Sequence, residues 1–170
     1  MDKTILLLDQ HEMDSSVKID ERDSYYARKA VRAVLSDNSE HIALMYAKQR
    51  DYYKLPGGGV DEGEDLTTAL ARELLEETGS KAQVTEELGQ VLEWRDFKKM
   101  KQISYAYKAL LEGEPGEPDF TQSEIDEGFE VRWIDNLDEA IKLIESKVTH
   151  EDLEVVFMSK RDAAILRAAK

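Results

Sequence analysis

The chain contains no cysteine, which excludes disulfides, thiolate zinc sites and catalytic cysteines. It also lacks a long apolar run. Residues 5–8, with the sequence ILLL, are too few for the core of a signal peptide and far too few to span a bilayer. We therefore expect a cytoplasmic protein that does not associate with a membrane.

Basic side chains are scarce. The 23 Lys and Arg residues are outnumbered by 37 Asp and Glu residues, which leaves a formal net charge of −14. Such a charge repels polyanions over most of a surface, so the binding of bulk nucleic acid or of an anionic membrane is disfavoured. A small phosphorylated metabolite remains compatible if a divalent metal ion screens the site. The acidity could equally serve solubility alone.

Internal repeats, low-complexity tracts and Pro/Ser-rich linkers are also missing, so we expect one domain over residues 1–170. A chain of this length buries roughly 70% of the surface that it exposes when unfolded, which is enough for a stable core. Within this domain we expect an N-terminal extension at 1–22 that holds a strand, and a C-terminal helical segment at 148–170.

The spacing of apolar residues predicts the secondary structure. The turn formers at 37–39 predict that the strands on either side pair as a hairpin. Mixed strands and a few helices indicate an α/β fold with helices packed on the faces of a sheet. Helices are expected at 65–77, 137–146 and 151–169, and strands at 4–8, 26–35, 42–47, 52–55, part of 83–94, 102–111 and 129–134.

The predicted helix at 65–77 carries three glutamates on one side. Asp65 can cap its N-terminus, and Gly79 can provide a left-handed C-terminal cap. At about 100° per residue, Glu73, Glu76 and Glu77 fall within an arc of roughly 100°, beside an arc of leucines and alanines. Like charges at this spacing destabilise a helix by a few tenths of a kcal/mol per pair. A hard divalent cation such as Mg²⁺ would turn this repulsion between the glutamates into a stabilising interaction, because carboxylate oxygens bind it readily.

A plainer interpretation of this helix is a solvated acidic face that Arg72 balances, because its guanidinium can reach Glu76 one turn on and Glu64 across the loop. The preceding residues favour metal binding instead. Residues 55–64, with the sequence LPGGGVDEGE, are rich in glycine, and a glycine backbone can approach a metal–phosphate group closely. On its own, a glycine triplet before a helix indicates only a turn.

Loop and helix together form one long pattern: Gly58, five residues, Glu64, seven residues, REL at 72–74, one residue, EE at 76–77, one residue and Gly79. This pattern resembles the Nudix box and matches all seven of its fixed positions, as should happen by chance in about one chain per 10⁵. Ser80 departs from the box, which usually has an aliphatic residue there. Because that position packs rather than reacts, we expect only a small local change.

The resemblance covers residues 58–80 and implies a Nudix-type α/β/α sandwich with a mixed sheet. It implies a hydrolase that depends on Mg²⁺, with Mn²⁺ as a substitute, and that cleaves a phosphoanhydride bond in a nucleoside diphosphate derivative. Arg72 would orient a glutamate by a charge-assisted hydrogen bond, and Glu64 would stiffen the junction of loop and helix. The implied metal ligands are Glu73, Glu76 and Glu77, together with the carbonyl of Gly57 or Gly58.

The resemblance also implies a general base, either a box glutamate or one from a distant loop. The distant candidates are Glu124, Asp126 and Glu127, of which we favour Glu127, although an ordinary polar loop would carry the same residues.

Substrate contacts are expected at Gly58 and Gly59, and from aromatic side chains that can stack on a base. Each of these aromatics could equally belong to the core. We favour Trp94 and Tyr105 over Phe97 and Tyr107.

The expected partner is a small-molecule nucleotide. The chain lacks the proline that ADP-ribose hydrolases of the family carry beyond the box, and the NADH and coenzyme A signatures are not apparent. Nucleoside triphosphates, including oxidised ones, and the 5′ end of RNA remain, and the net charge argues mildly against RNA. A catalytically inactive nucleotide-binding or regulatory module is the alternative, and its usual mark would be broken metal ligands. A prenyl diphosphate isomerase would need a cysteine. The strand at 4–8 could extend the sheet or pair with a second subunit in a homodimer.

Overall fold

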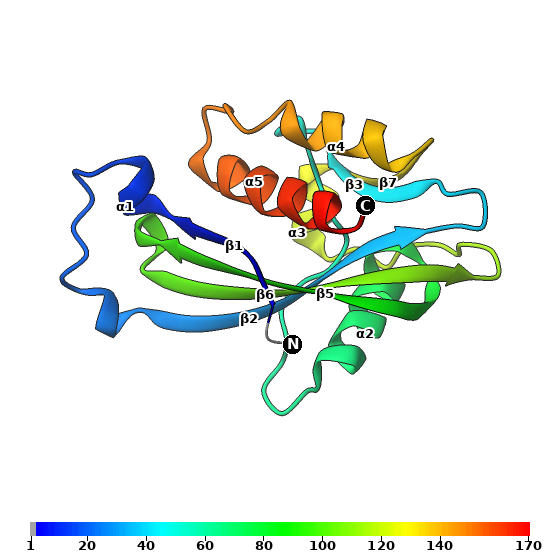
Figure 1. Ribbon diagram of the computed structural model, residues 1–170. Coiled ribbons are helices and arrows are strands. Elements are labelled where there is room, and N and C mark those ends of the chain that lie inside the picture. Colours follow the sequence, from blue (N-terminus) through cyan, green and yellow to red (C-terminus); the bar gives the residue numbers. More distant parts are fainter. Residues whose placement is uncertain (1–2) are drawn as a thin grey trace.

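The computed structural model describes residues 3–170, and these residues form a mixed sheet of seven strands with helices on both faces (Figure 1). β1 runs parallel to β5 and β2 runs parallel to β6, whereas the other paired strands are antiparallel. The order across the sheet is β1 (Thr4–Asp9), β5 (Lys81–Arg95), β6 (Met100–Glu112), β2 (Tyr26–Ser36), β3 (Ile42–Ala47) and β4 (Tyr52–Lys54), and β7 (Phe129–Ile134) also pairs with β3.

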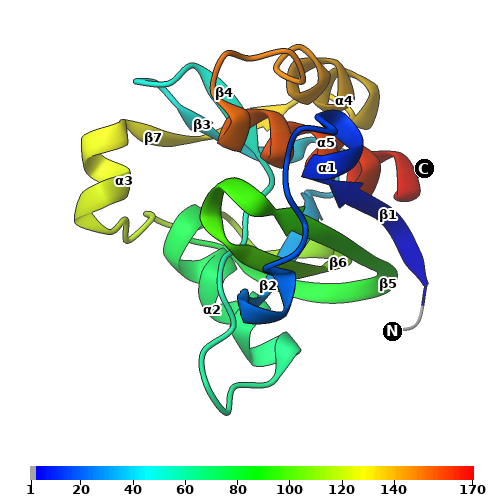
Figure 2. The same cartoon turned by 90° about the vertical axis from the view of Figure 1, so that its left-hand side faces the viewer.

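Long helices cover the two faces of this sheet. Figures 1 and 2 show long helices both below and above the sheet. The α/β/α sandwich with a mixed sheet is therefore confirmed. The lower helix is α2 (Leu66–Thr78), and the upper two are α4 (Leu137–Glu145) and α5 (Leu153–Ala168).

The alternation of side chains along β2 explains why both faces are covered. Val31, Ala33 and Leu35 belong to the apolar cluster between the sheet and α2. Val34 points the other way and belongs to the cluster that α4 and α5 complete. Successive residues of a strand face opposite sides of the sheet, so this central strand contributes to two apolar layers.

Most elements lie where the apolar pattern predicts them. The strands expected at 42–47 and 129–134 coincide with β3 and β7, and the helices expected at 137–146 and 151–169 contain α4 and α5. Within residues 3–170, no helix is both long and apolar enough to cross a membrane. Four short elements were missed because one or two turns leave little periodicity to detect. These are α1 (Gln10–Met13), η1 (Arg22–Ser24), η2 (Asp96–Lys98) and α3 (Gln122–Glu127).

The predicted hairpin of β2 and β3 was wrong beyond its turn. The two strands are in register only at Ser36 and Ile42. Below this point the loop at 56–60 lies against β2 instead: Val31 N donates to Gly58 O at 2.9 Å, and Ala33 N donates to Pro56 O at 3.0 Å. The loop thus satisfies backbone groups that β3 leaves free, because buried amide and carbonyl groups need partners. The glycine-rich loop is therefore bonded to β2 through its backbone.

Candidate active site

The helix that carries the box glutamates begins and ends at the predicted caps. The Asp65 side chain accepts hydrogen bonds from the backbone amides of Thr67 and Thr68, which would otherwise lack partners in the first turn. Gly79 ends the helix with φ 64°, and a β-carbon there would lie 2.4 Å from the Gly116 backbone. Only glycine combines this left-handed conformation with so close an approach. Leu70 and Leu74 anchor the helix to the sheet.

Two glycines allow the loop at 56–60 to pass through the narrow space between β2 and α2. Gly57 has φ 127°, and a β-carbon on it would lie 2.2 Å from Val31 O. A β-carbon on Gly58 would lie 2.3 Å from a carboxylate oxygen of Glu73. The Gly57 amide donates to Glu77 Oε2 at 2.6 Å. The backbone therefore passes close to β2 and to two box glutamates at once, which a side chain at either position would prevent.

Arg72 connects the loop to the helix through all of its nitrogens. Its Nε and Nη2 donate to the two oxygens of Glu64 at 3.0 and 2.9 Å, and Nη2 also donates to Gly59 O at 3.0 Å. Its Nη1 donates to Glu73 at 2.8 Å and to Glu76 at 3.2 Å. The bonds to Arg72 lower the pKa of the Glu64 carboxyl, and in return they raise the pKa of Arg72. Both residues lie where the sequence pattern placed them, at the junction of loop and helix.

The three box glutamates differ in environment, so they do not form a uniformly solvated acidic face. The Glu76 side chain is 47% exposed, whereas those of Glu73 and Glu77 are 12% and 4% exposed. Lys54 Nζ at the end of β4 lies 2.6 Å from Glu77 Oε1. Burial raises the pKa of the Glu73 carboxyl, and the charge of Glu77 adds to the effect while Arg72 opposes it. This part of the helix therefore concentrates negative charge that favours a bound cation.

The described part of the chain, residues 3–170, brings no three His, Cys, Asp or Glu side chains close enough together to hold a metal ion as they stand. Each box glutamate instead has a cationic neighbour: Lys54 for Glu77, and Arg72 for Glu73 and Glu76. The donor set nevertheless suits Mg²⁺, which prefers carboxylate and carbonyl oxygens. The Gly58 carbonyl is already engaged, because it accepts from Val31 N, which leaves the Gly57 carbonyl as the backbone candidate.

A cleft of about 450 Å³ opens beside this face of α2. Glu124 of α3 lines it, whereas Glu127 does not. Glu127 lies at the end of α3 with Oε2 3.7 Å from Nη1 of Arg50. Distant parts of the chain thus meet at the box. The lining residues are Arg72, Glu73, Glu76, Glu77, Asp119, Phe120, Thr121 and Glu124.

Comparison with known proteins identifies this arrangement. Residues 27–153 match the model of the NUDIX domain, and this match spans well over half of the chain. The chain belongs to the Nudix family. A NUDIX hydrolase structure from Nitrosomonas europaea superimposes with a TM-score of 0.59 over 80% of this chain and 88% of that chain, at 17% identity, which shows the shared fold.

Two curated relatives resemble parts of the Nudix chain. An RNA pyrophosphohydrolase of Caulobacter vibrioides is 37% identical over 108 residues, which cover 54% of this chain and 60% of that protein. A putative 8-oxo-dGTP diphosphatase of Bacillus subtilis is 41% identical over 64 residues, which cover 38% of this chain and 42% of that protein. The chain thus spans 60% or less of the length of these two relatives.

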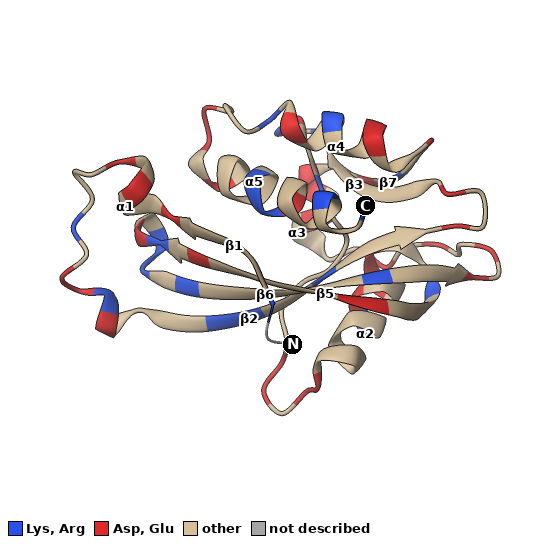
Figure 3. Cartoon of the chain, viewed as in Figure 1, with Lys and Arg blue, Asp and Glu red and all other residues tan. Residues whose placement is uncertain are grey.

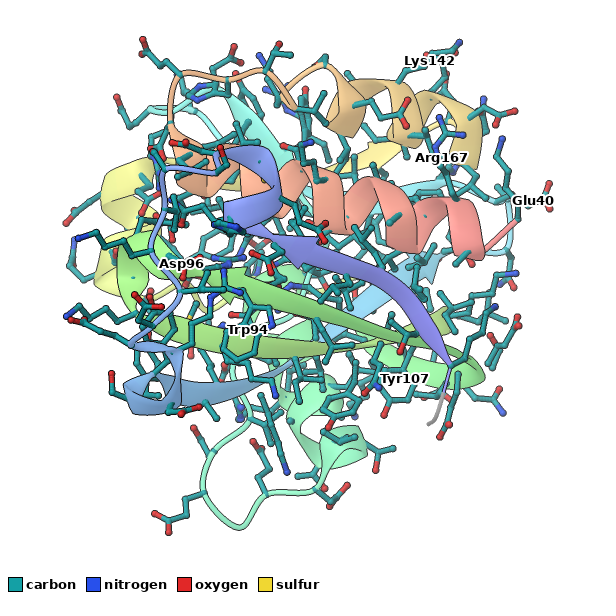
Figure 4. The ribbon with its side chains drawn as sticks, turned by 60° about the vertical axis from the view of Figure 1, so that its left-hand side comes forward. Glu40, Trp94, Asp96, Tyr107, Lys142 and Arg167 are labelled. Atoms are coloured by element: carbon teal, nitrogen blue, oxygen red, sulfur yellow. The ribbon has the colours of Figure 1, made fainter. Side chains whose placement is uncertain are left out.

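The two aromatics favoured for stacking lie away from the Nudix cleft. Trp94 packs beneath the guanidinium of Arg22, 4.9 Å from the ring centroid, and beside Tyr25. Figure 4 shows Trp94 next to Asp96 at one end of the long strands, with Tyr107 at the other end. Tyr105 packs against the apolar cluster between the sheet and α2. Neither Trp94 nor Tyr105 is among the residues that line the cleft.

Apart from Arg72, the sequence did not indicate the partners of the Nudix glutamates. Lys54 precedes the box by only a few residues, yet no spacing rule predicts that it pairs with Glu77. Asp119 and Thr121 follow a turn-rich loop and reach the cleft only because the Asp119 amide donates to Glu76 O at 2.7 Å. These contacts depend on folding, so no local pattern could have revealed them.

Proposed function

We propose that this chain hydrolyses a phosphoanhydride bond of a nucleoside diphosphate derivative in a reaction that requires Mg²⁺ or Mn²⁺. One observation carries the proposal: a complete Nudix box whose three glutamates, arginine and glycine loop are joined by hydrogen bonds beside an open cleft. The names of the partial relatives, an RNA pyrophosphohydrolase and a putative 8-oxo-dGTP diphosphatase, support the same bond type.

The residues that would hold the metal are Glu73, Glu76 and Glu77, with the Gly57 carbonyl. When bound, Mg²⁺ neutralises charge on the phosphoryl oxygens and makes a water more acidic. Arg72 keeps the Glu73 and Glu76 carboxylates turned toward one side of the helix through bonds of 2.8 and 3.2 Å. The Gly57 amide fixes the orientation of Glu77.

A general base must lie within hydrogen-bond reach of the attacking water. On that criterion Glu124, which lines the cleft, is better placed than Glu127, which lies outside it. Glu124 also closes a capping box with Thr121, so its backbone is well fixed.

We expect Glu124→Gln to lower kcat by about 10²–10⁴-fold, the usual contribution of a general base. Glutamine also serves in a capping box, so α3 should stay folded. Glu127→Gln is the matched control and should change kcat by less than tenfold. The measurement is kcat at saturating substrate and Mg²⁺, with circular dichroism to confirm folding. A large loss in Glu127→Gln with normal turnover in Glu124→Gln would assign the base to Glu127 instead.

The proposed function is tested by measuring phosphate release with Mg²⁺ over a panel of nucleoside triphosphates, nucleotide sugars, dinucleoside polyphosphates and capped RNA. We expect hydrolysis of at least one class and its loss when EDTA removes the metal. A blank over the whole panel, with Mn²⁺ as well as Mg²⁺, would contradict the proposal and favour a catalytically inactive nucleotide-binding module.

A further inference from the structure

Both carboxylate oxygens of Glu77 already have a partner within the protein. Oε1 lies 2.6 Å from Lys54 Nζ, and Oε2 accepts from the Gly57 amide at 2.6 Å. The side chains of Glu77 and Lys54 are only 4% and 14% exposed, so water and salt screen this ion pair poorly. A metal ion that uses Glu77 therefore meets a carboxylate that is paired with another cation.

The two cations that pair with the box glutamates differ in what else holds them. Arg72 donates to Glu64 through two of its nitrogens, so its guanidinium is fixed at the loop. Within residues 3–170, Lys54 forms an ion pair with Glu77 alone. A lysine ammonium is a compact charge on a flexible stem, whereas an arginine binds through a rigid fork. Lys54 is therefore the partner that can leave its glutamate.

The backbone around Lys54 is fixed, so a displacement involves only its side chain. Lys54 is the last residue of β4, which pairs with β3, and the next amide, that of Leu55, donates to the buried Asp162 carboxylate at 2.9 Å. The ammonium also lies over the ring of Phe129, 4.9 Å from its centroid. The face of an aromatic ring attracts a cation, so Phe129 offers the ammonium a contact that does not depend on Glu77.

Some movement is needed before the box can hold a cation. In the part of the chain that the structure describes, no three carboxylates converge closely enough for a metal ion as they stand. The surrounding surface is acidic, as the red segments on the loop that leads into α2 show in Figure 3. This charge attracts a cation, whereas an ammonium and a divalent cation on one carboxylate oxygen repel each other at short range. Departure of Lys54 frees an oxygen of Glu77 and removes this repulsion.

We propose that Lys54 competes with the metal for Glu77: it pairs with this glutamate while no metal is bound, and a binding cation displaces it. The inference rests on the proposed function, because it takes Glu77 as a metal ligand. The affinity for the metal is then lower than the glutamates alone would give, since the ion pair must break first. Lys54 thus sets the metal concentration at which the box fills.

The first experiment measures metal binding without substrate. Mn²⁺ alone is titrated calorimetrically into the protein at about 0.15 M salt, where distant surface charges are largely screened. We expect Lys54→Met to bind Mn²⁺ at least tenfold more tightly than the wild type. Lys48→Met, which removes an exposed lysine from the turn between β3 and β4, is the matched control and should bind like the wild type. Equal or weaker binding by Lys54→Met would overturn the proposal.

Thermal denaturation of the same variants checks the result if Lys54→Met is partly unfolded during calorimetry. Without metal, Lys54→Met should melt at a lower temperature than the wild type, because the buried Glu77 carboxylate loses its cationic partner. A ligand stabilises the folded state according to its affinity. At the same Mn²⁺ concentration, the melting temperature of Lys54→Met should therefore rise by more than that of the wild type. An equal or smaller rise would count against competition.

The second experiment detects the displacement itself. The protein is acetylated briefly with acetic anhydride, with and without Mg²⁺, and the modification of each lysine is measured by mass spectrometry. We expect Mg²⁺ to increase the acetylation of Lys54 at least threefold and to leave that of Lys48 unchanged. In Glu77→Gln, Lys54 should be acetylated equally in both conditions. Unchanged acetylation of Lys54 in the wild type would overturn the displacement, even if Lys54→Met binds Mn²⁺ more tightly, because Lys54 would then act by repulsion from a fixed position.

Failure of the proposed function gives a different result. If neither Mn²⁺ binding nor hydrolysis is found, the proposed function is contradicted together with the competition. If Glu77→Gln binds Mn²⁺ as tightly as the wild type, Glu77 is not a metal ligand and the competition is contradicted at its premise. If Glu77→Gln binds weakly and the wild type hydrolyses its substrate, but Lys54→Met binds Mn²⁺ like the wild type, only the competition is contradicted.

Discussion

Replacement of Glu77 by glutamine should lower turnover by roughly 10²–10⁴-fold, because a metal ligand supplies several kcal/mol of stabilisation to the transition state. Glutamine retains an oxygen that can accept from the Gly57 amide, so the loop should keep its position. The charge is lost, however, and the half-maximal Mg²⁺ concentration should rise. The measurement is kcat as a function of Mg²⁺ concentration.

The same variant should also be less stable. Glu77 is 4% exposed and pairs with Lys54, which is 14% exposed, so the substitution leaves a poorly solvated ammonium without its partner. Breaking a buried pair costs up to about 3–5 kcal/mol, so activity is measured at a temperature where the variant remains folded. Glu62→Gln, in the exposed part of the same loop, is the control and should match the wild type. Wild-type turnover and Mg²⁺ dependence in Glu77→Gln would show that Glu77 is not a ligand.

Gly57→Ala should cause the largest loss of stability among substitutions in the loop. The alanine would need a strained backbone at φ 127°, and its β-carbon would meet Val31 O at 2.2 Å. Strain and steric overlap together lower the free energy of unfolding by about 3–5 kcal/mol, which lowers the melting temperature by roughly 6–20 °C. Because the amide of Gly57 holds Glu77, turnover should fall as well. Thermal denaturation and kcat measure the two effects.

Gly63→Ala separates the effect of backbone strain from the effect of steric overlap. Gly63 also has a positive φ, 80°, but a β-carbon there would have no atom within 4 Å. Gly63→Ala should therefore lower the free energy of unfolding by only about 1 kcal/mol, from backbone strain alone. Equal melting temperatures for the two variants would show that the loop moves away from β2 at no cost, and that the close contact with Val31 does not position the box.

The sequence alone determined the box helix and the pattern of residues that it carries. Apolar spacing, the cap at Asp65 and the glycine at 79 all act within a few residues, so the helix and both of its ends were predicted before any contact was known. The spacing of Arg72 and Glu76 likewise predicted their bond, because one turn of helix brings these two side chains within reach. Local geometry is sufficient for each of these features.

The tertiary structure alone decided what surrounds the helix. It paired Glu77 with Lys54. It brought Glu124 rather than Glu127 to the cleft. It also packed Trp94 beneath the guanidinium of Arg22. It also placed arginines of β2, β5 and α5 around one cavity on the face of the sheet opposite α2, although they are far apart in sequence. Such contacts depend on strand order and register, which the sequence pattern did not predict when it paired β2 with β3. The box thus follows from local spacing, whereas the residues that surround it follow from how the sheet is assembled.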